Sequence, residues 1–203
     1  MKKYAVLHEP GDIVTLAGTR FVVLDVERRG SLPDSLFLLA LESVGASEFG
    51  SSNNYAESDL KKAVDKWLED MGKRGLDNAK LIPREIDLTT LDGSGCYGKL
   101  SVKAAPLTLD EAREYADIIP NAERWCWLAT GWSGPSKSDG DLALYVNSDG
   151  DWDNLNCSIS YGIRPALKIP SDLLLDSADK PDLSEVPTDT LLEEIRRRVV
   201  DKA

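Results

Sequence analysis

Histidine is almost absent from this chain of 203 residues, because His8 is the only one. A Ser-His-Asp triad, a Cys-His pair or a histidine-containing metal site would have to use it. The three cysteines, Cys96, Cys126 and Cys157, are widely separated and lack the C-x-x-C spacing of a zinc-binding loop. We therefore expect no metal and no cofactor, and we interpret the cysteines as small buried side chains in a reducing compartment.

Positive charge is also scarce, since 24 Lys and Arg stand against 35 Asp and Glu and leave a formal charge of −11. Partners with phosphate backbones or anionic lipid headgroups need clustered cations, so we expect neither nucleic acid nor a membrane as partner. No run approaches the roughly 18 apolar residues of a membrane span, and the first apolar stretch is too short for a secretory signal. We expect a soluble protein, cytoplasmic when synthesised, without a signal peptide; association with a virion or a surface stays open.

The first third of the chain predicts a small sheet and one helix. Residues 11–26 contain two β-rich runs separated by Ala-Gly-Thr and are typical of a hairpin, and residues 35–41 predict a buried strand. From Ser58, which can cap a helix, apolar residues recur at helical spacing until Gly72, which can end it. The stripe consists of Leu60, Val64, Trp67, Leu68 and Met71.

The middle of the chain is rich in turns. Residues 93–100 nearly match a phosphate-binding loop, but Leu100 stands where Ser or Thr should bind magnesium, and the next residues are not typical of a helix. We interpret residues 93–100 as a flexible connector. Thr108 and Glu111 then form a capping box, which predicts a short helix through about Tyr115.

The stretch from 125 to 169 is unusual in its tryptophans and amides. Trp125 and Trp127 alternate on one strand, and we expect both to be structural core residues on one face. A polar loop, 131–140, precedes a predicted hairpin. The first arm of this hairpin is 142–146, its turn is 147–150, and its second, polar arm is 151–160. A closing strand, 161–169, carries Arg164, which we expect to hydrogen-bond backbone carbonyls or a carboxylate as a structural anchor.

These motifs carry a resemblance to a known family. The W-x-W-L strand, the Gly/Ser loop, the V-N-S-D-G turn and the closing G-I-R-P-A-L resemble a bacterial and phage domain family of unknown function with the C-type-lectin-like fold. The stretches 11–26 and 51–68 are also similar to that family. It resembles, more distantly, the variable proteins of diversity-generating retroelements and the formylglycine-generating enzymes. Together the motifs cover most of residues 11–169.

The resemblance implies an α+β, C-type-lectin-like domain over residues 1–170, with a mixed twisted sheet and two helices. It also implies a non-enzymatic, receptor-recognition protein that binds a protein or glycan ligand through residues 132–160, as the variable target of a diversity-generating retroelement does. Trp and Tyr supply contact area and Asn, Ser and Asp supply adaptable hydrogen bonds. The expected contact residues are Trp132, Ser133, Asp141, Tyr145, Asp151, Trp152, Asn154, Asn156 and Ser158.

Alternatives to this function stay open. One is an oxidase of the formylglycine-generating type using Cys126 and Cys157, which requires the two cysteines to lie close together. Another is a purely structural phage or prophage component. A calcium loop at residues 147–158 is disfavoured, because Trp152 replaces its turn glycine and Ser158 its bidentate glutamate.

The last segment, 171–203, has a different composition. It begins as an acidic linker with Pro181 and Pro187 and ends in an amphipathic stretch over residues 188–200. Acidic residues come first and arginines last, as the helix dipole favours. Its apolar stripe leaves two alternatives open, docking on its own domain or binding to a partner helix. We favour a C-terminal helical appendage that serves self-association or partner binding.

Overall fold

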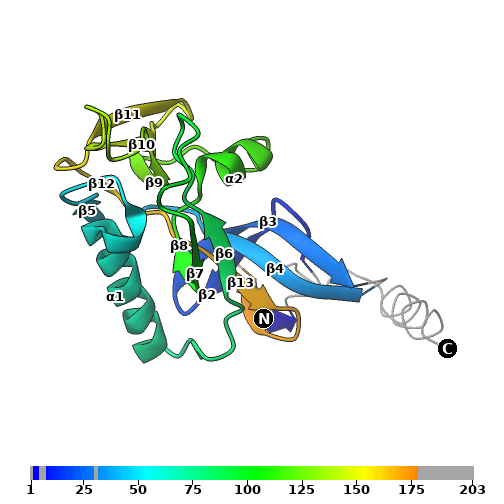
Figure 1. Cartoon of the computed structure of the whole chain (residues 1–203). Coiled ribbons are helices and arrows are strands. Elements are labelled where there is room, and N and C mark those ends of the chain that lie inside the picture. Colours follow the sequence, from blue (N-terminus) through cyan, green and yellow to red (C-terminus); the bar gives the residue numbers. More distant parts are fainter. Residues whose placement is uncertain (1, 5–7, 30–31, 178–203) are drawn as a thin grey trace, which may run out of the picture.

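The computed structural model describes residues 2–4, 8–29 and 32–177 (Figure 1). This part of the chain has an α+β fold dominated by strands, with two α-helices, as the sequence predicts. In chain order the elements are β1 (Lys2–Tyr4), β2 (Ile13–Leu16), β3 (Thr19–Arg29), β4 (Leu32–Ala40), β5 (Ala46–Glu48), the 3-10 turn η2 (Tyr55–Glu57), α1 (Asp59–Lys73), β6 (Arg84–Asp87), β7 (Lys99–Val102), β8 (Ala104–Ala105), α2 (Leu109–Glu114), β9 (Cys126–Gly131), β10 (Leu142–Val146), β11 (Trp152–Asn156), β12 (Ser160–Gly162), β13 (Ala166–Pro170) and β14 (Leu174–Ser177).

The strands of the described residues divide among three sheets rather than forming one mixed sheet. A seven-stranded sheet has the order β1-β14-β2-β3-β4-β13-β8, and a five-stranded sheet has the order β11-β10-β9-β12-β5. Strands β6 and β7 form a separate pair. Within the described residues the pairing of β12 with β9 is the parallel one, and the other strand pairs are antiparallel.

Two apolar cores lie on opposite faces of these sheets. Alternating residues of β3 and β4 point to different cores: Phe21 and Leu38 belong to the core that α1 covers, whereas Val22 and Leu39 belong to the core that α2 covers. Strands with both faces buried are continuously apolar, which is why the run at 35–41 shows no alternation. The second core also contains Leu128 and Leu144 of the five-stranded sheet, so α2 packs between the two large sheets.

The expected N-terminal hairpin and buried strand are confirmed. Strands β2 and β3 pair from Ile13 opposite Val22 to Leu16 opposite Thr19. The turn between them places Ala17 at φ 47° and Gly18 at φ 77°, and two successive positive φ angles give the tight turn that matches strand twist. Strand β4 pairs with β3 and β13 and is buried from Ser35 to Ala40.

Helix α1 begins where the sequence predicts but ends later. The Ser58 hydroxyl accepts from the Lys61 backbone N–H at 2.9 Å, as a helix cap does. Four of the five stripe residues are buried: Leu60, Val64, Trp67 and Met71. Gly72 does not end the helix, which runs to Lys73; Gly75, at φ 103°, supplies the left-handed turn that follows.

The expectation of a flexible connector at 93–100 is wrong, because this stretch is the end of a hydrogen-bonded hairpin loop and the start of β7. Arg84 to Asp87 pair with Lys99 to Val102 as an antiparallel hairpin. Its loop is held by Thr90, whose backbone N–H donates to the Ser94 carbonyl at 3.0 Å and whose hydroxyl donates to Asp92 at 2.5 Å. Leu100 therefore lies in a strand, and no helix follows the glycine-rich turn.

The closing stretch 161–169 is two strands rather than one. Strand β12 ends at Gly162 in the five-stranded sheet, and β13 begins at Ala166 in the seven-stranded sheet. Arg164 lies at this crossover. The domain also extends past residue 170, because β14 pairs with β1 and β2 and so belongs to the large sheet. The amphipathic stretch 188–200 lies outside the described residues.

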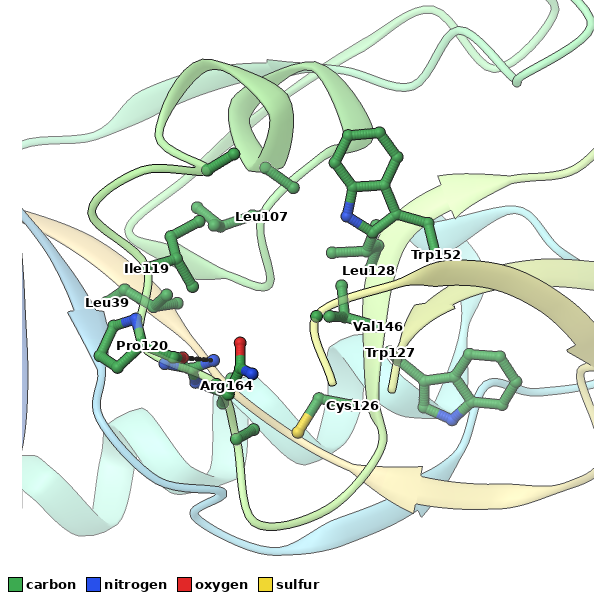
Figure 2. A pocket seen from close by; sticks show the side chains of 15 residues that line it. Leu39, Leu107, Ile119, Pro120, Cys126, Trp127, Leu128, Val146, Trp152 and Arg164 are labelled. Atoms are coloured by element: carbon green, nitrogen blue, oxygen red, sulfur yellow. Dashed lines mark hydrogen bonds between the residues drawn. The ribbon is translucent and has the colours of Figure 1, made fainter. Parts of the chain in front are cut away.

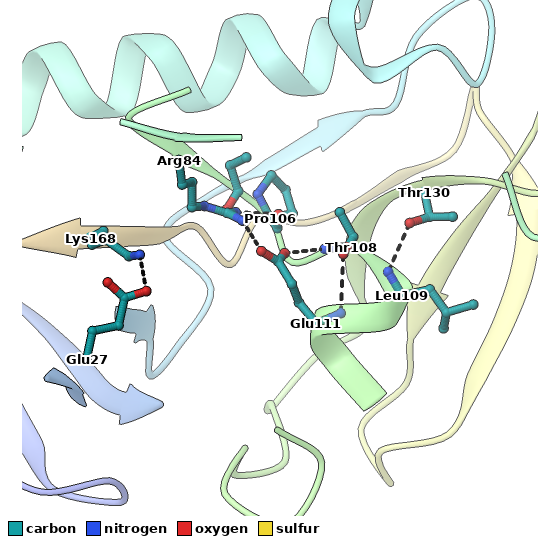
Figure 3. A network of polar contacts seen from close by, with 9 residues as sticks. Glu27, Arg84, Pro106, Thr108, Leu109, Glu111, Thr130 and Lys168 are labelled. Carbon is teal, nitrogen blue, oxygen red and sulfur yellow. Dashed lines mark hydrogen bonds and ion pairs between the residues drawn. The ribbon is translucent and has the colours of Figure 1, made fainter. Parts of the chain in front are cut away.

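Helix α2 is fixed by a buried polar network that Figure 3 shows. The capping box is confirmed: the Thr108 hydroxyl accepts from the Glu111 N–H at 3.2 Å, and the Glu111 carboxylate accepts from the Thr108 N–H at 2.8 Å. The same carboxylate pairs with Arg84, and the Leu109 N–H donates to the Thr130 hydroxyl at 2.9 Å. Helix α2 is thereby attached to β6 and to β9.

Candidate ligand-binding surfaces

The predicted polar hairpin forms one edge of the five-stranded sheet. Strands β10 and β11 pair with Val146 opposite Trp152 and Leu144 opposite Asn154. The Asn147 side-chain oxygen accepts from the N–H groups of Asp149 at 2.8 Å and Asp151 at 3.0 Å, which closes the turn. This oxygen therefore holds the turn together, and among the described residues no three His, Cys, Asp or Glu side chains converge as a metal site.

The expected contact residues divide into exposed and buried groups. Trp152 is 39% exposed, and Asp141, Asp151 and Ser158 are also exposed. Trp132, Asn154 and Asn156 are half-buried. Ser133 and Tyr145 are buried, so the expectation that they contribute to the contact surface is wrong. Tyr145 points to the face of the sheet that carries the α1 core, because strand residues alternate between faces.

A polar cluster lies where β10 begins and β11 ends. The Asn156 amide donates to the Asp141 carboxylate at 2.6 Å. Its carbonyl oxygen accepts from the Ser158 hydroxyl at 2.7 Å and from the Ser158 N–H at 3.0 Å. The structure thus brings together three of the expected contact residues and orders their side chains before any ligand is present.

A buried asparagine positions the loop that leads into this hairpin. The Asn53 amide donates to the Ser133 carbonyl at 2.8 Å and to the Leu142 carbonyl at 2.9 Å, and its oxygen accepts from the Tyr97 hydroxyl at 2.6 Å. The atoms of Asn53 lie so close to Gly131 that a Cβ there would meet them at 2.9 Å. Asn53 lies within the S-S-N-N stretch, but its role depends on residues far along the chain, so sequence reasoning missed it.

Trp125 is not a core residue, contrary to the sequence prediction. It is 43% exposed, whereas Trp127 is buried as expected. The Trp125 ring stacks on Tyr145 at 5.2 Å between centroids with an interplanar angle of 13°, and it meets Tyr161 edge-on at 5.5 Å. Both tryptophans do share a face, since Trp127 also contacts these two tyrosines. Trp125 precedes the first residue of β9 and therefore lies at the border of the sheet.

An open polar groove adjoins Trp125. Its volume is about 460 Å³, and it is lined by Trp125, Arg124, Glu123, Ser148, Ser160 and Tyr161, among others. An exposed indole beside hydroxyl and charged groups is a surface on which a polar ligand can stack and form hydrogen bonds. Sequence reasoning missed this groove because it treated Trp125 as interior.

A second, more enclosed pocket lies beneath α2, and Figure 2 shows its lining. Its volume is about 100 Å³. Most of its walls are apolar side chains, including Leu107, Ile119, Leu128 and Val146, with Trp152 at one end and Arg164 at the other. Arg164 fulfils its predicted structural role, because its guanidinium donates to the Ala40 carbonyl at 2.9 Å and to the Pro120 carbonyl at 3.1 Å.

The two buried cysteines have little nucleophilic character. Cys126 and Cys157 are buried and not disulfide-bonded, and Cys96 is exposed. Burial raises the pKa of the Cys126 thiol to about 11 and that of Cys157 to about 12, so neither is a thiolate near neutral pH. This gives no support to the oxidase alternative. The Nδ1 of His8 lies 3.1 Å from the Asp12 carboxylate. In the part of the chain that the structure describes, His8 forms no hydrogen bond with a cysteine.

No protein-family model, curated protein or solved structure matches this chain. The residues themselves therefore carry the functional inference. Neither helix in the described part of the chain is long and apolar enough to cross a membrane.

Proposed function

We propose that this chain is a non-enzymatic ligand-binding protein with a C-type-lectin-like domain, which recognises a protein or glycan through its β10–β11 hairpin. The observation that carries the proposal is the exposed Trp152 on the edge strand β11, in line with Asn154 and Asn156. The neighbouring strands β9 and β10 are almost wholly buried. An aromatic ring among amides is the composition of a recognition surface rather than of a core strand.

The rigidity of the hairpin also supports recognition. Asn53 holds the preceding loop from the interior, and Asp141, Asn156 and Ser158 hold one another at the surface. Side chains that are already ordered lose less conformational entropy on binding. The fold tolerates variation here, since Trp152, Asn154 and Asn156 belong to neither core. Such a surface suits the variable protein of a diversity-generating retroelement, and we include that role in the proposal.

The binding test uses the whole protein on a glycan array and against a displayed peptide library. A hit is then measured with the double variant Trp152→Ala, Asn154→Ala. We expect affinity to fall by about 30-fold or more, as for the loss of a central aromatic contact. Leu91→Ala is the control, because Leu91 is similarly exposed, at 37%, on a different loop.

Trp125→Ala decides which surface the ligand uses. It removes the same side chain with a similar exposure, but from the groove beside Tyr161. Loss of binding only in the Trp125 variant would move the site to that groove. Unchanged affinity in a folded Trp152/Asn154 variant would refute the hairpin as the contact surface.

The retroelement role has its own test in the neighbouring DNA. We expect a reverse transcriptase and a near-copy of the coding stretch for residues 125–166. A gene neighbourhood without either would refute that role and leave the binding function to the affinity measurements.

A further inference from the structure

Two aromatic rings form the walls of the groove beside β9. Trp125 is the most exposed large apolar side chain in the described part of the chain, at 43%. Its indole stacks on Tyr145, which fixes the ring from behind and leaves the other face to the solvent. Tyr161 meets the same indole at 74°, and both rings line the groove. The groove therefore has a rigid aromatic corner, which loses little entropy when a ligand packs into it.

The polar side chains of this groove are free of one another. Arg124, Ser148 and Ser160 are exposed, and Tyr161 is half-buried. None of these four side chains forms a hydrogen bond or an ion pair with another residue that the structure describes. In contrast, the side chains of the polar cluster where β10 begins and β11 ends hydrogen-bond one another. The groove thus offers its polar groups to a ligand.

Donors outnumber acceptors among these free groups. The guanidinium of Arg124 can only donate, and the three hydroxyls can each donate. Among the described residues that line the groove, Glu123 alone has a side chain that can only accept. The best-matched ligand is therefore one that has many acceptors and few donors. A proline-rich segment has this character, because each proline keeps its carbonyl and lacks the N–H.

We propose that this groove binds a proline-rich peptide in the polyproline II conformation. A prolyl ring packs on the free face of Trp125 and against Tyr161, while Arg124 and Ser160 donate to peptide carbonyls. Those carbonyls have no partner within a polyproline II helix. Aromatic-lined grooves recognise such segments because the preformed helix has little entropy left to lose. The groove volume of about 460 Å³ lies within the roughly 300–1,000 Å³ of ligand sites.

Other ligand classes match the groove less well. Glu123 and Arg124 bring both signs of charge to its lining, so an ion gains no net attraction there. Both side chains are exposed, and solvent and salt screen their charges further. A saccharide carries as many donors as acceptors, and its donors would find few acceptors among these side chains.

The proposal goes beyond the hairpin function and does not depend on it. The two exposed indoles lie on opposite faces of the five-stranded sheet. Tyr145, behind Trp125, belongs to the core that α1 covers. Trp152 lies opposite Val146, which packs on the core that α2 covers. A ligand on one indole therefore leaves the other free.

The experiment titrates the full-length protein with decaproline, acetylated and amidated, and with a Gly-Ser peptide of the same length. Binding is measured by calorimetry and by tryptophan fluorescence, because the emission of an exposed indole shifts to shorter wavelength when a ligand covers it. We expect decaproline to bind with a dissociation constant of about 10 μM to 1 mM. The Gly-Ser peptide should bind at least about tenfold more weakly, because it is flexible and has no prolyl ring. No binding of decaproline up to about 5 mM, or equal affinity for the two peptides, overturns the proposal.

Two variants locate the peptide. Trp125→Ala should weaken decaproline binding by about tenfold or more, as for the loss of a central aromatic contact. Trp152→Ala is the matched control, because it removes an indole of similar exposure, 39%, from the other face, and its affinity should not change. Arg124→Ala removes a donor whose side chain has no described partner, so the fold should persist while affinity falls about threefold. Unchanged affinity in either folded groove variant refutes the site, and Arg124→Ala decides alone if Trp125→Ala does not fold.

The same titrations distinguish this proposal from its competitors. Cellobiose and chitobiose are tested at about 10 mM. A saccharide that binds through Trp125 while decaproline does not would overturn the peptide assignment. Loss of decaproline binding in Trp152→Ala, with binding kept in Trp125→Ala, would move the peptide to the hairpin and refute the groove.

Discussion

Two buried arginines join distant parts of this molecule, and only one of them has its charge neutralised. Arg84 is 7% exposed and Arg164 is 6% exposed. Arg84 pairs with Glu111, donates to the carbonyls of Ala105 and Pro106 at 3.1 Å each, and lies over the Phe37 ring at 5.1 Å. Arg164 donates to two carbonyls and has no carboxylate partner among the described residues.

The difference separates a neutralised structural joint, at Arg84, from an uncompensated charge, at Arg164. Each guanidinium has one buried nitrogen without a hydrogen-bond partner among the described residues, Nε of Arg84 and Nη2 of Arg164. What distinguishes them is the carboxylate, because Glu111 compensates the charge of Arg84 and also caps α2. A buried charge without a partner is unfavourable by several kcal/mol in real proteins, so it persists where it is put to use or reached by polar groups from outside. The following predictions test whether the two regions really differ in this way.

The largest effect is expected at the neutralised joint. Glu111→Gln keeps an acceptor for the capping box but leaves Arg84 as a buried, unpaired charge. The free energy of unfolding should fall by about 3–5 kcal/mol, measured by chemical denaturation. Glu85→Gln, which breaks the exposed pair with Lys99 on the same strand, should change it by less than about 1 kcal/mol. Equal effects of the two substitutions would contradict the assignment of Arg84 as a buried joint.

A smaller loss is expected at Arg164. Arg164→Met removes donors from the Ala40 and Pro120 carbonyls, but it also removes an uncompensated charge, and the two effects partly offset each other. We expect the free energy of unfolding to fall by about 1–3 kcal/mol. A loss as large as that in Glu111→Gln would show that the Arg164 charge is already compensated, and the contrast between the two regions would fail.

The thiol of Cys126 reports on the charge of Arg164. Burial raises its pKa to about 11, and the nearby Arg164 partly opposes this shift. Alkylation follows the thiolate, so its rate at Cys126 should increase with pH through about 11. In Arg164→Met the profile should move to still higher pH, whereas Arg84→Met should leave it in place. The measurement is made with Cys96→Ser in every variant, because Cys96 is exposed, and the modified cysteine is identified by mass spectrometry.

The smallest effect is expected at the exposed contact between Arg113 and Trp152. Arg113→Gln removes the cation over the Trp152 ring, a contact that typically contributes about 0.5–1 kcal/mol at exposed sites. The free energy of unfolding, measured by chemical denaturation, should fall by no more than that. A loss as large as that in Arg164→Met would contradict the ranking of an exposed cation below a buried one.

The sequence predicts the local elements of this fold well. The hairpin at 13–22, the cap of α1 at Ser58, the capping box of α2 and the β10–β11 hairpin are all confirmed. Each depends on hydrogen bonds or periodicities within a few residues of chain. The prediction that Arg164 donates to backbone carbonyls is also confirmed. A guanidinium among apolar neighbours needs hydrogen-bond acceptors, and backbone carbonyls supply them.

The candidate site is less predictable. Trp125 is exposed, while Ser133 and Tyr145 are buried, although all three lie in a stretch with uniform composition. Which face of a strand is covered depends on what packs against it, and here both faces of the five-stranded sheet are covered except at its edges. The polar character of residues 131–160 thus indicates a surface but does not identify its members.

The sequence by itself determined the α+β class, the turns and caps, and the shortage of histidine and positive charge that disfavours several classes of chemistry. Only the tertiary structure decided that the closing stretch crosses between two sheets and that Arg164 meets carbonyls 124 and 44 residues away. It also decided that Arg84 finds a carboxylate and Arg164 does not. The physical reason is that periodicity and capping act within one or two turns of chain, whereas compensation of a buried charge depends on which distant segments fold around it.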